Sequence, residues 1–545
     1  MERKAIRAAC VALVGALCVV LPALAKEAAK PLAALDAQAA RAMKEFDVPG
    51  MAIAVVKDGR VVHAKGYGVR KVGEPGAVDA DTLFGIASNT KAFTCAAISI
   101  LAEESRLDWD DPVTKHLAEF QMYDPWVTRE VTLRDLVTHR AGLGLGQGDL
   151  MWWPATDFTR REIVRGIRHL KPASSLRSRY AYSNVMYVAA GEVVAEVSGR
   201  SWDEFLRERL FAPLGMSRSN TSVAANRDNV AAPHLVVKGR PAPVAPMRAD
   251  NCGAAGAINS SAADMARWLR MLLECGRRGP RQGQGQGQAQ EAGCLLKPES
   301  IERMFSAQIP LATPDPPAGL EALRASFAAY GLGFALRDYR GRKLVSHTGG
   351  LPGYVSQVSL VPEERLGVVV LTNQEQGGAF RAVTQSVLDD YLGPPAPAVD
   401  WVAAFRRQGE EQAKRAELVV SAAASARDAA STPSLPLARY AGRYRDPWYG
   451  DVVITEASGK LTLEMTRTRG MIGELSHWQH DSFVAHWRDA FMSDTQPADA
   501  FVTFALRPDA SIERMTMAPV SPAIDFSFDF QDLLFTPVAA PVPRP

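Results

Sequence analysis

The sequence predicts an α+β fold: an antiparallel sheet flanked by helices, with a helical subdomain, followed by a small all-β, barrel-like domain. Short apolar segments typical of strands occur near the N-terminus and again after residue 333, with helical patterns between them. One sheet built from both ends of this region, with helices beside it, accounts for that order. After about residue 435 the pattern changes to short, alternating, turn-separated segments, which are typical of a barrel or sandwich.

The first domain is expected to begin with a helix over residues 28–45 and a β-hairpin. Residues 51–56 and 61–64 are mostly apolar, and the Asp58-Gly59 pair between them is typical of a tight hairpin turn. An apolar helix follows, running to about residue 101. Hydrophobic periodicity then predicts helices at residues 133–138, 159–168, 185–198, 202–210 and 264–274.

Strands return after a low-complexity Gly/Gln-rich segment, residues 276–293, which we expect to be mobile. They are predicted at 333–337, 343–347, 353–361 and 366–371, followed by a helix at 380–392. A charged helical stretch then leads to the linker residues 431–434 and to strands at 451–455, 461–466, 482–486, 501–506 and 512–517. We therefore place a first domain at 26–395, a helical linker at 396–434, a β-barrel-like domain at 435–536 and a disordered proline-rich tail at 537–545.

Residues 1–25 have the pattern of a secretory signal peptide. A basic start precedes an apolar run from Ala8 to Leu24, and Ala23-Leu24-Ala25 is a small-x-small cleavage site. A retained membrane anchor is the alternative, but about 17 apolar residues interrupted by Pro22 are short for a bilayer span. The sequence therefore predicts export, to the periplasm if the source is a Gram-negative bacterium, with no stable membrane span after cleavage.

Charge and cysteine content limit the classes of partner and cofactor. The whole chain has a formal net charge of +2, and residues 1–25 carry that excess, so the mature chain is formally neutral. This gives no support for nucleic acid or an anionic membrane as a partner. The mature cysteines lack zinc-like or redox spacing, so we expect no metal and no cofactor. Cys275 and Cys294 are equally compatible with a disulfide in an oxidising compartment and with free thiols.

Ser88 and Lys91 are the first candidate catalytic residues. They lie three residues apart, at the start of the apolar helix, and therefore on one helical face. A serine hydroxyl becomes nucleophilic when a base takes its proton and positive charge favours the alkoxide. The alternative is structural: a serine that caps the helix and a lysine that extends to solvent.

Tyr182 and Asn184 precede the helix predicted from residue 185. A tyrosine can act as a base only if its pKa is lowered from about 10, which a nearby ammonium would do. We expect Tyr182 and Lys91 to titrate as a unit and do not assign the resting base between them. Asn184 offers an amide that can orient Lys91 and contact a substrate carbonyl. The structural alternative is a packed loop tyrosine and a helix-capping asparagine.

The sequence His347-Thr348-Gly349-Gly350 ends a predicted strand. Glycines there would let a substrate backbone approach closely, and an exposed strand edge could bind a peptide-like amide. The backbone N–H of Gly350 could complete an oxyanion hole with that of Ser88. A histidine in a simple turn is the structural alternative.

Together and in this order, the three segments resemble the penicillin-recognising serine hydrolases: class C β-lactamases, penicillin-binding DD-peptidases, and the related serine esterases and D-aminopeptidases. The motif is Ser-x-x-Lys, Tyr-x-Asn and Lys/His-Thr-Gly. Residues 133–143, 182–191, 211–216 and 254–267 are also similar to the family, and the resemblance covers about residues 33–395. The region after residue 435 resembles a small β-rich domain of unknown function that is often appended to such hydrolases.

The resemblance implies acyl transfer to Ser88, with Lys91 and Tyr182 moving the proton. It implies substrate contacts from Asn184, His347, Thr348 and Gly349, and an oxyanion hole from the N–H groups of Ser88 and Gly350. We therefore expect an amide- or ester-cleaving enzyme of DD-peptidase, D-aminopeptidase or esterase type, acting on a small-molecule or peptide-like substrate. The alternatives are a β-lactamase, a non-hydrolysing penicillin-binding or sensor protein, and an interaction protein that works through its barrel.

One departure weakens the β-lactamase alternative. The lactamases carry lysine at the position of His347, and histidine is mostly neutral at pH 7. The sequence leaves open the exact substrate, the role of the C-terminal domain and the oligomeric state.

Overall fold

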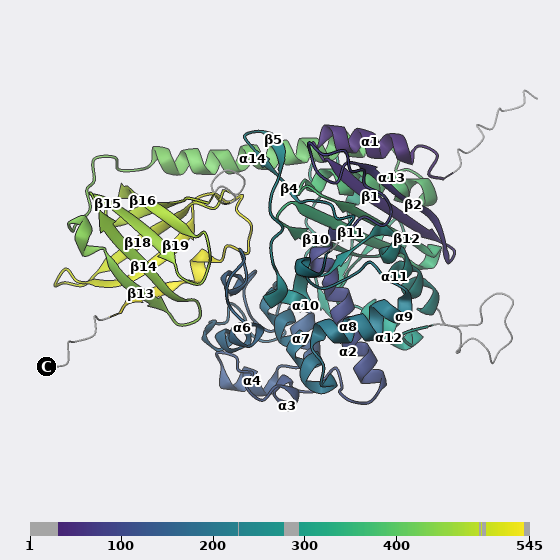
Figure 1. The fold of residues 1–545 in the computed structure, drawn as a ribbon, viewed down its shortest axis with the longest axis horizontal. Coiled ribbons are helices and arrows are strands. Elements are labelled where there is room, and N and C mark those ends of the chain that lie inside the picture. Colours follow the sequence, from purple (N-terminus) through teal and green to yellow (C-terminus); the bar gives the residue numbers. More distant parts are fainter. Residues whose placement is uncertain (1–30, 227, 277–293, 490–491, 493–496, 539–545) are drawn as a thin grey trace, which may run out of the picture.

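A computed structural model describes residues 31–226, 228–276, 294–489, 492 and 497–538. The chain forms a large α+β domain beside a closed β-barrel, joined by one long helix (Figure 1). The expected signal peptide, the Gly/Gln-rich residues 277–293 and the last seven residues lie outside the described residues.

The core of the first domain is an antiparallel sheet with the strand order β2-β1-β12-β11-β10-β9-β8-β7. The N-terminal strand β1 pairs along its length with β12, so that Met51 lies opposite Thr372. The sheet is thus closed by segments from both ends of the domain. Its strands are β1 (Gly50–Lys57), β2 (Arg60–Gly68), β7 (Ile309–Pro310), β8 (Ala328–Tyr330), β9 (Ala335–Tyr339), β10 (Arg342–Leu351), β11 (Tyr354–Val361) and β12 (Leu366–Thr372).

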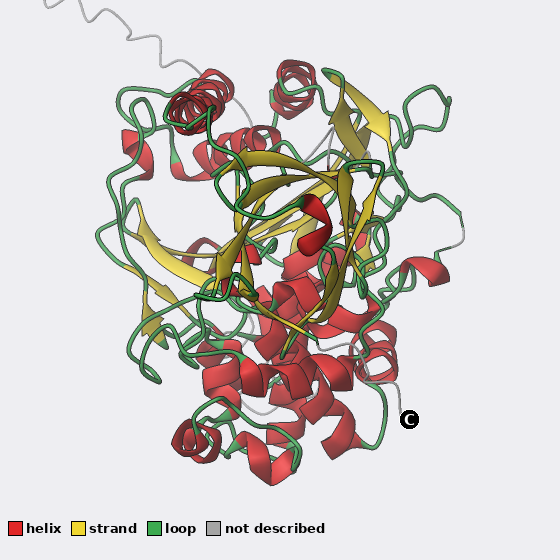
Figure 2. Cartoon of the chain, turned by 90° about the vertical axis from the view of Figure 1, so that its left-hand side faces the viewer, coloured by secondary structure: helices red, strands yellow, loops and turns green. Residues whose placement is uncertain are grey.

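Helices lie in two groups, one on each side of the strands (Figures 1 and 2). One face of the sheet is covered by α1 (Leu35–Glu45), α13 (Gly377–Leu392) and the start of α14 (Trp401–Ser425), which share a separate apolar cluster. On the other side, α11 packs against β1 and β12. This side holds α2 (Thr90–Glu103), α3 (Val113–His116), α4 (Pro125–Glu130), α5 (Leu133–Val137), α6 (Arg160–Gly166), α7 (Asn184–Ser198), α8 (Trp202–Leu206), α9 (Ala212–Leu214), α10 (Gly253–Gly256), α11 (Ala262–Cys275) and α12 (Pro298–Met304).

The C-terminal domain is a closed barrel in which each strand pairs with the next and β20 pairs back to β13. Trp448, Tyr449 and Trp487 are buried, so these aromatic residues belong to its core and are not free to bind a ligand. The strands are β13 (Gly442–Asp446), β14 (Gly450–Ala457), β15 (Lys460–Met465), β16 (Ile472–Gln479), β17 (Ser482–Trp487), β18 (Ala500–Leu506), β19 (Ile512–Pro519) and β20 (Leu534–Pro537).

The barrel docks directly on the helical side of the first domain. Arg467 forms ion pairs with Asp157 and Glu162, and its guanidinium lies 3.7 Å from the ring centroid of Phe158. The backbone N–H of Gly148 donates to Asp529 across the contact, at 2.6 Å. Buried apolar residues of both domains form one continuous cluster. The two domains therefore share a core instead of being tethered by a linker alone.

The structure corrects several predicted elements. The strand expected to end at His347 continues as β10 to Leu351, because β11 pairs with it over that whole stretch. The N-terminal helix begins only at Leu35. Three barrel strands, β13, β16 and β20, were not predicted; β16 has a largely polar sequence, and cross-strand pairing on both sides holds it in place.

Cys275 and Cys294 are disulfide-bonded, which selects one of the two alternatives left open by the sequence.

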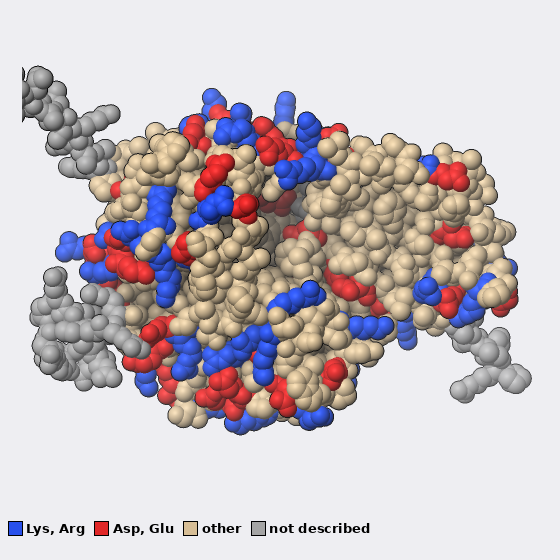
Figure 3. Space-filling model, turned by 180° about the vertical axis from the view of Figure 1, so that it is seen from behind, with Lys and Arg blue, Asp and Glu red and all other residues tan. Residues whose placement is uncertain are grey.

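Within the described residues, no helix is long and apolar enough to cross a membrane. Positive and negative side chains are interspersed on the face seen from behind, and the surface is hollowed between the two domains (Figure 3).

Gly349→Ala tests how closely β10 packs against the turn that carries Ser88. A Cβ at Gly349 would lie 2.2 Å from the carbonyl oxygen of Ile86, whereas a Cβ at Gly350 would meet nothing within 4 Å. We expect Gly349→Ala to lower the free energy of unfolding by about 1–3 kcal/mol, as overpacking commonly does. Gly350→Ala is the matched control and should melt like the wild type. Equal melting temperatures for both variants would contradict this packing.

Candidate active site

Ser88 lies in a single 3-10 turn, residues Ala87–Asn89, that leads directly into α2. The turn is held from both sides: Ile86 N donates to Ile258 O, and the Ser356 hydroxyl donates to Ile86 O. Ala87, just before Ser88, has a φ of +48°, a left-handed conformation that is unfavourable for a residue with a Cβ. The fold therefore holds Ser88 in a strained, fixed turn.

Lys91 is fully buried, and its Nζ contacts three oxygen atoms. These are Ser88 Oγ at 3.0 Å, Asn184 Oδ1 at 2.8 Å and Ala255 O at 2.9 Å. The amide and carbonyl oxygens can only accept, so they take two N–H groups of Lys91. The remaining position on Nζ faces Ser88, where an ammonium would donate a proton and a neutral amine would offer a lone pair. The alternative of a lysine extending to solvent is wrong.

Burial lowers the pKa of Lys91 from its usual 10.5 to about 7. Taking the ammonium out of water disfavours its charged form, and the nearby carboxylate of Asp149 opposes the shift only in part. Lys91 can thus be neutral near physiological pH, with its lone pair directed at the Ser88 hydroxyl.

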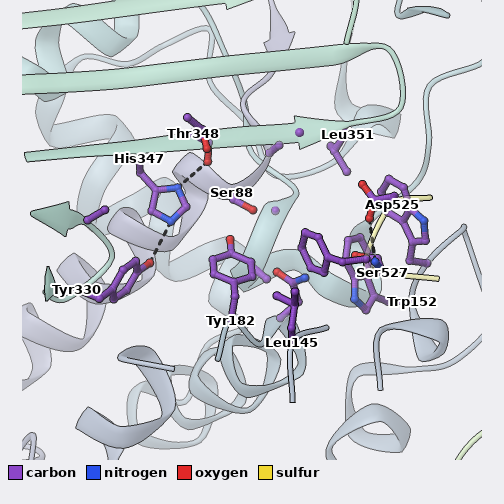
Figure 4. Close-up of a pocket in the computed structure, with 18 of the residues that line it drawn as sticks. Ser88, Leu145, Trp152, Tyr182, Tyr330, His347, Thr348, Leu351, Asp525 and Ser527 are labelled. Carbon is purple, nitrogen blue, oxygen red and sulfur yellow. Dashed lines mark hydrogen bonds between the residues drawn. The ribbon is translucent and has the colours of Figure 1, made fainter. Parts of the chain in front are cut away.

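Tyr182 lies beside Lys91, whose Nζ is 4.7 Å from the tyrosine ring centroid. Its hydroxyl points toward Ser88 (Figure 4). Burial raises the pKa of Tyr182 well above 10, against the lowering that we expected from the sequence. The neighbouring lysine cannot supply that lowering, because its own pKa is depressed. The phenol therefore keeps its proton, and of the two groups Lys91 is the one that can be neutral and accept a proton near pH 7.

His139 packs against Tyr182 and the residue that follows it. Its Nδ1 accepts from the backbone N–H of Ser183 at 3.0 Å, and its ring lies 4.3 Å from that of Tyr182. Burial lowers the pKa of His139 well below its usual 6.5, so the ring is neutral. Its contacts fix the loop that carries Tyr182.

Asn184 is held between two charged groups. Its Oδ1 accepts from Lys91, and its Nδ2 donates to Asp149 Oδ2 at 2.8 Å. This pattern fixes which end of the amide is which. Burial raises the pKa of Asp149 to about 7, and interactions with Trp152, Asn184 and Ser527 oppose the rise.

His347 is buried and neutral. Its Nδ1 lies 2.6 Å from the carbonyl oxygen of Thr348, which can only accept, so Nδ1 carries the proton. Nε2 then accepts from the hydroxyl of Tyr330 at 3.0 Å (Figure 4). Burial, assisted by the charge of Lys91, lowers the pKa of His347 to about 3. The position that carries a cation in the lactamases is uncharged here.

The end of β10 forms one wall of the site. β9 pairs only with Arg342–Ser346, which leaves the outer edge of residues 347–351 open. Thr348 and Gly350 face the pocket. A Cβ at Gly349 would meet the carbonyl oxygen of Ile86, so the missing side chain serves packing here, and substrate contact by the Gly349 backbone stays a prediction.

These groups surround a pocket of about 450 Å³ with a largely apolar lining. Part of the lining comes from the barrel domain, for which we predicted no site from the sequence. The lining residues are Ala87, Ser88, Leu145, Trp152, Trp153, Tyr180, Tyr182, Asn184, Ala255, Gly256, Tyr330, Ala335, Ser346, His347, Thr348, Gly350, Leu351, Asp525, Phe526 and Ser527.

The polar residues of the site that the sequence analysis missed include Asp149, Tyr330, Asp525 and Ser527. Asp149 lies in a glycine-rich loop, and a single aspartate there carries no spacing signal. Asp525 and Ser527 belong to the other domain. In the described ranges, no group of three or more His, Cys, Asp or Glu side chains is placed to hold a metal ion.

The chain is similar in sequence and in fold to several known proteins. The chain is 28% identical to an unguisins hydrolase from Aspergillus campestris, covering 77% of this chain and 78% of the relative. It is 29% identical to penicillin-binding protein 4 from Amycolatopsis lactamdurans, covering 64% and 86%. The fold matches that of the octameric penicillin-binding protein homologue from Pyrococcus abyssi, with a TM-score of 0.58, 22% identity and coverage of 92% and 98%.

Two family models match the two domains separately. Residues 426–537 match a domain of unknown function, DUF3471. Residues 35–392, well over half of the chain and the part that contains the whole Ser88–Lys91–Tyr182 cluster, match the Beta-lactamase model, and the chain therefore belongs to the Beta-lactamase family.

Proposed function

We propose that this protein is an exported serine hydrolase that cleaves amide or ester bonds through an acyl-enzyme on Ser88. The observation that carries the proposal is the 3.0 Å contact between Ser88 Oγ and the buried Nζ of Lys91, whose other hydrogen-bond partners are acceptors. The disulfide between Cys275 and Cys294 supports the export part of the proposal, since such bonds persist in oxidising compartments.

In the acylation step, neutral Lys91 takes the proton of Ser88 as Oγ bonds to the substrate carbonyl carbon. The carbonyl oxygen becomes an oxyanion, which the N–H groups of Ser88 and Gly350 stabilise; one such donor contributes about 3 kcal/mol to lowering the barrier. The oxyanion then collapses and the bond to the leaving alcohol or amine breaks.

The leaving group needs a proton, and Tyr182 is suited to deliver it. Its raised pKa keeps the phenol protonated, and it adjoins both Ser88 and Lys91. Tyr182 gives its proton to the leaving group and receives the one that Lys91 took from Ser88. Water then attacks the acyl-enzyme with Lys91 again as base, which releases the acid and restores Ser88.

The charges around the pocket favour substrates without a carboxylate near the scissile bond. Within the described lining, Asp525 is the one acidic residue and there is no Lys or Arg. His347 is neutral, because burial lowers its pKa to about 3. β-Lactams and peptides with a C-terminal carboxylate bring a negative charge that nothing in this lining would pair. We therefore propose neutral or cationic esters and amides, of esterase or aminopeptidase type, in preference to β-lactams.

The decisive experiment is a panel of p-nitrophenyl esters, alanine p-nitroanilides in both D and L series, D-Ala-D-Ala peptides and nitrocefin. Wild type should turn over members of the first two groups, and Ser88→Ala and Lys91→Arg should lose nearly all turnover. Tyr182→Phe should be slower by about 10²–10⁴-fold, the usual contribution of a proton donor. Stoichiometric labelling by a fluorescent penicillin without turnover of any panel member would instead favour a non-hydrolysing penicillin-binding protein.

The kcat/KM for a neutral ester should rise with pH and reach half its maximum near pH 7. Below the pKa of Lys91, about 7, the ammonium cannot accept the proton of Ser88; above it, the free amine can. Stopped-flow or plate assays from pH 5 to 9 measure this rise of kcat/KM with pH. A rate that is flat from pH 6 to 9 would exclude Lys91 as the base.

Asp525→Asn should reduce discrimination against anionic substrates. We expect wild type to cleave N-acetyl-alanine p-nitroanilide with a kcat/KM about tenfold or more above that of the N-succinyl analogue, because ionised Asp525 repels the succinyl carboxylate in a site of low dielectric. Burial raises the pKa of Asp525, so the comparison is made at pH 9, where the carboxylate form is favoured. Asp525→Asn removes that charge at constant shape, and the two substrates should then be cleaved at similar rates. An unchanged ratio in the variant would mean that Asp525 does not face the bound substrate.

A further inference from the structure

A segment of the barrel domain reaches the active site of the other domain. Between β19 and β20, the chain passes over the pocket and contributes Asp525, Phe526 and Ser527 to its lining (Figure 4). The segment is anchored next to the site, because Asp529 accepts from the backbone N–H of Gly148. Ser527 is buried, whereas Phe526 is exposed.

Ser527 ends a continuous chain of hydrogen bonds that starts at the nucleophile. Its hydroxyl donates to Asp149 Oδ2 at 2.9 Å, and the same carboxylate oxygen accepts from Asn184 Nδ2 at 2.8 Å. Asn184 Oδ1 accepts from Lys91 Nζ at 2.8 Å, and Nζ lies 3.0 Å from Ser88 Oγ. Asp149, Asn184 and Lys91 are all buried, so water does not compete for these contacts.

We propose that Ser527 is a positioning residue of the active site, by which the barrel domain holds the Asp149 carboxylate and, through Asn184, the amine of Lys91. The proposal rests on the function proposed above, in that it assigns Ser527 to the same proton-accepting lysine. It gives the C-terminal domain a chemical role, because the Ser527 hydroxyl is a donor to Asp149 that comes from outside the first domain.

The hydroxyl of Ser527 also sets the charge near Lys91. Its hydrogen bond favours the ionised form of Asp149, and an ionised Asp149 favours the ammonium form of Lys91. Loss of the hydroxyl raises the pKa of Asp149 further, which makes it neutral at a higher pH. Lys91 then loses part of its counter-charge, and its pKa falls. The charged or titratable groups that face Asp149 or Lys91 are Cys95, His139, Tyr182, Tyr187, Cys252, His347 and Asp529.

The cysteines and histidines in this list cannot produce the same shift, and Asp529 is the other carboxyl in it whose pKa is raised by burial. Burial raises the pKa of Cys95 to about 12 and that of Cys252 higher still, and both histidines are neutral. These groups therefore keep one charge state between pH 5 and 9, whereas Asp149 changes in that range.

The test measures the rate at which a fluorophosphonate labels Ser88, followed by intact-protein mass from pH 5 to 9. In this reaction Ser88 Oγ bonds to phosphorus, fluoride leaves, and Lys91 takes the hydroxyl proton, so no natural substrate is needed. The variants, in the full-length protein, are Ser527→Ala, Ser527→Thr, which keeps the hydroxyl, and Asp149→Asn. Ser521→Ala is the matched control, because Ser521 lies in the same segment and its hydroxyl contacts only the N–H of Ala523.

We expect Ser527→Ala to slow labelling at high pH by about tenfold, as loss of a hydrogen bond to a charged group commonly does. Its pH midpoint should move to lower pH, while Ser527→Thr and Ser521→Ala keep the wild-type midpoint. Asp149→Asn should shift the midpoint in the same direction, and adding Ser527→Ala to it should shift it no further. A wild-type midpoint in Ser527→Ala, or a further shift in the double variant, would overturn the proposal.

The same data separate this proposal from the proposed function. In one outcome, wild type is labelled at Ser88 with the expected pH profile and yet turns over no ester or amide. That result would reject the proposed hydrolase function and leave the positioning role of Ser527 supported. If esters are hydrolysed and Ser88 in the Ser527→Ala variant is labelled at the wild-type rate at every pH, the hydrolase function is supported and the positioning role of Ser527 is rejected.

Discussion

The burial of the Lys91 amine beside Ser88 is the interaction on which the site depends. A lone ammonium in a protein interior is costly, and it is tolerated only where acceptors surround it or where it gives up its charge. Here both conditions hold: Asn184 and the Ala255 carbonyl accept its protons, and burial lowers its pKa to about 7. The rest of the domain supplies this environment, with α2 presenting the lysine, α7 the asparagine and α10 the carbonyl.

The barrel belongs to this environment and is not a separate module. It shares an apolar cluster with the helical side of the first domain and places Ser527 against the Asp149 carboxylate. A network that starts at the nucleophile of one domain therefore ends at a hydroxyl of the other. Docking of the domains and the electrostatics of the lysine are linked, because the carboxylate that receives Ser527 also acts on Lys91.

The charge of the pocket distinguishes this chain from the antibiotic-cleaving members of its family. A neutral His347 stands where those enzymes carry a cation, and Tyr330 holds its ring in the tautomer that accepts at Nε2. Asp525, from the barrel, is the one acidic residue of the described lining, and burial raises its pKa. In the proposed function, both features disfavour anionic substrates.

The sequence by itself determined the fold class and the residues nearest the chemistry. Ser88 and Lys91 share a helical face because of their spacing, and the hairpin turn at Asp58-Gly59 and the apolar helices follow from local patterns. These are short-range constraints, which one sequence can reveal. Tertiary structure decided the rest: that Lys91 and not Tyr182 has the pKa of a base, that Gly349 serves packing, and that Asp149, Asp525 and Ser527 belong to the site. Such properties arise from burial and from contacts between residues hundreds of positions apart, as between Asp149 and Ser527, and no local pattern contains them.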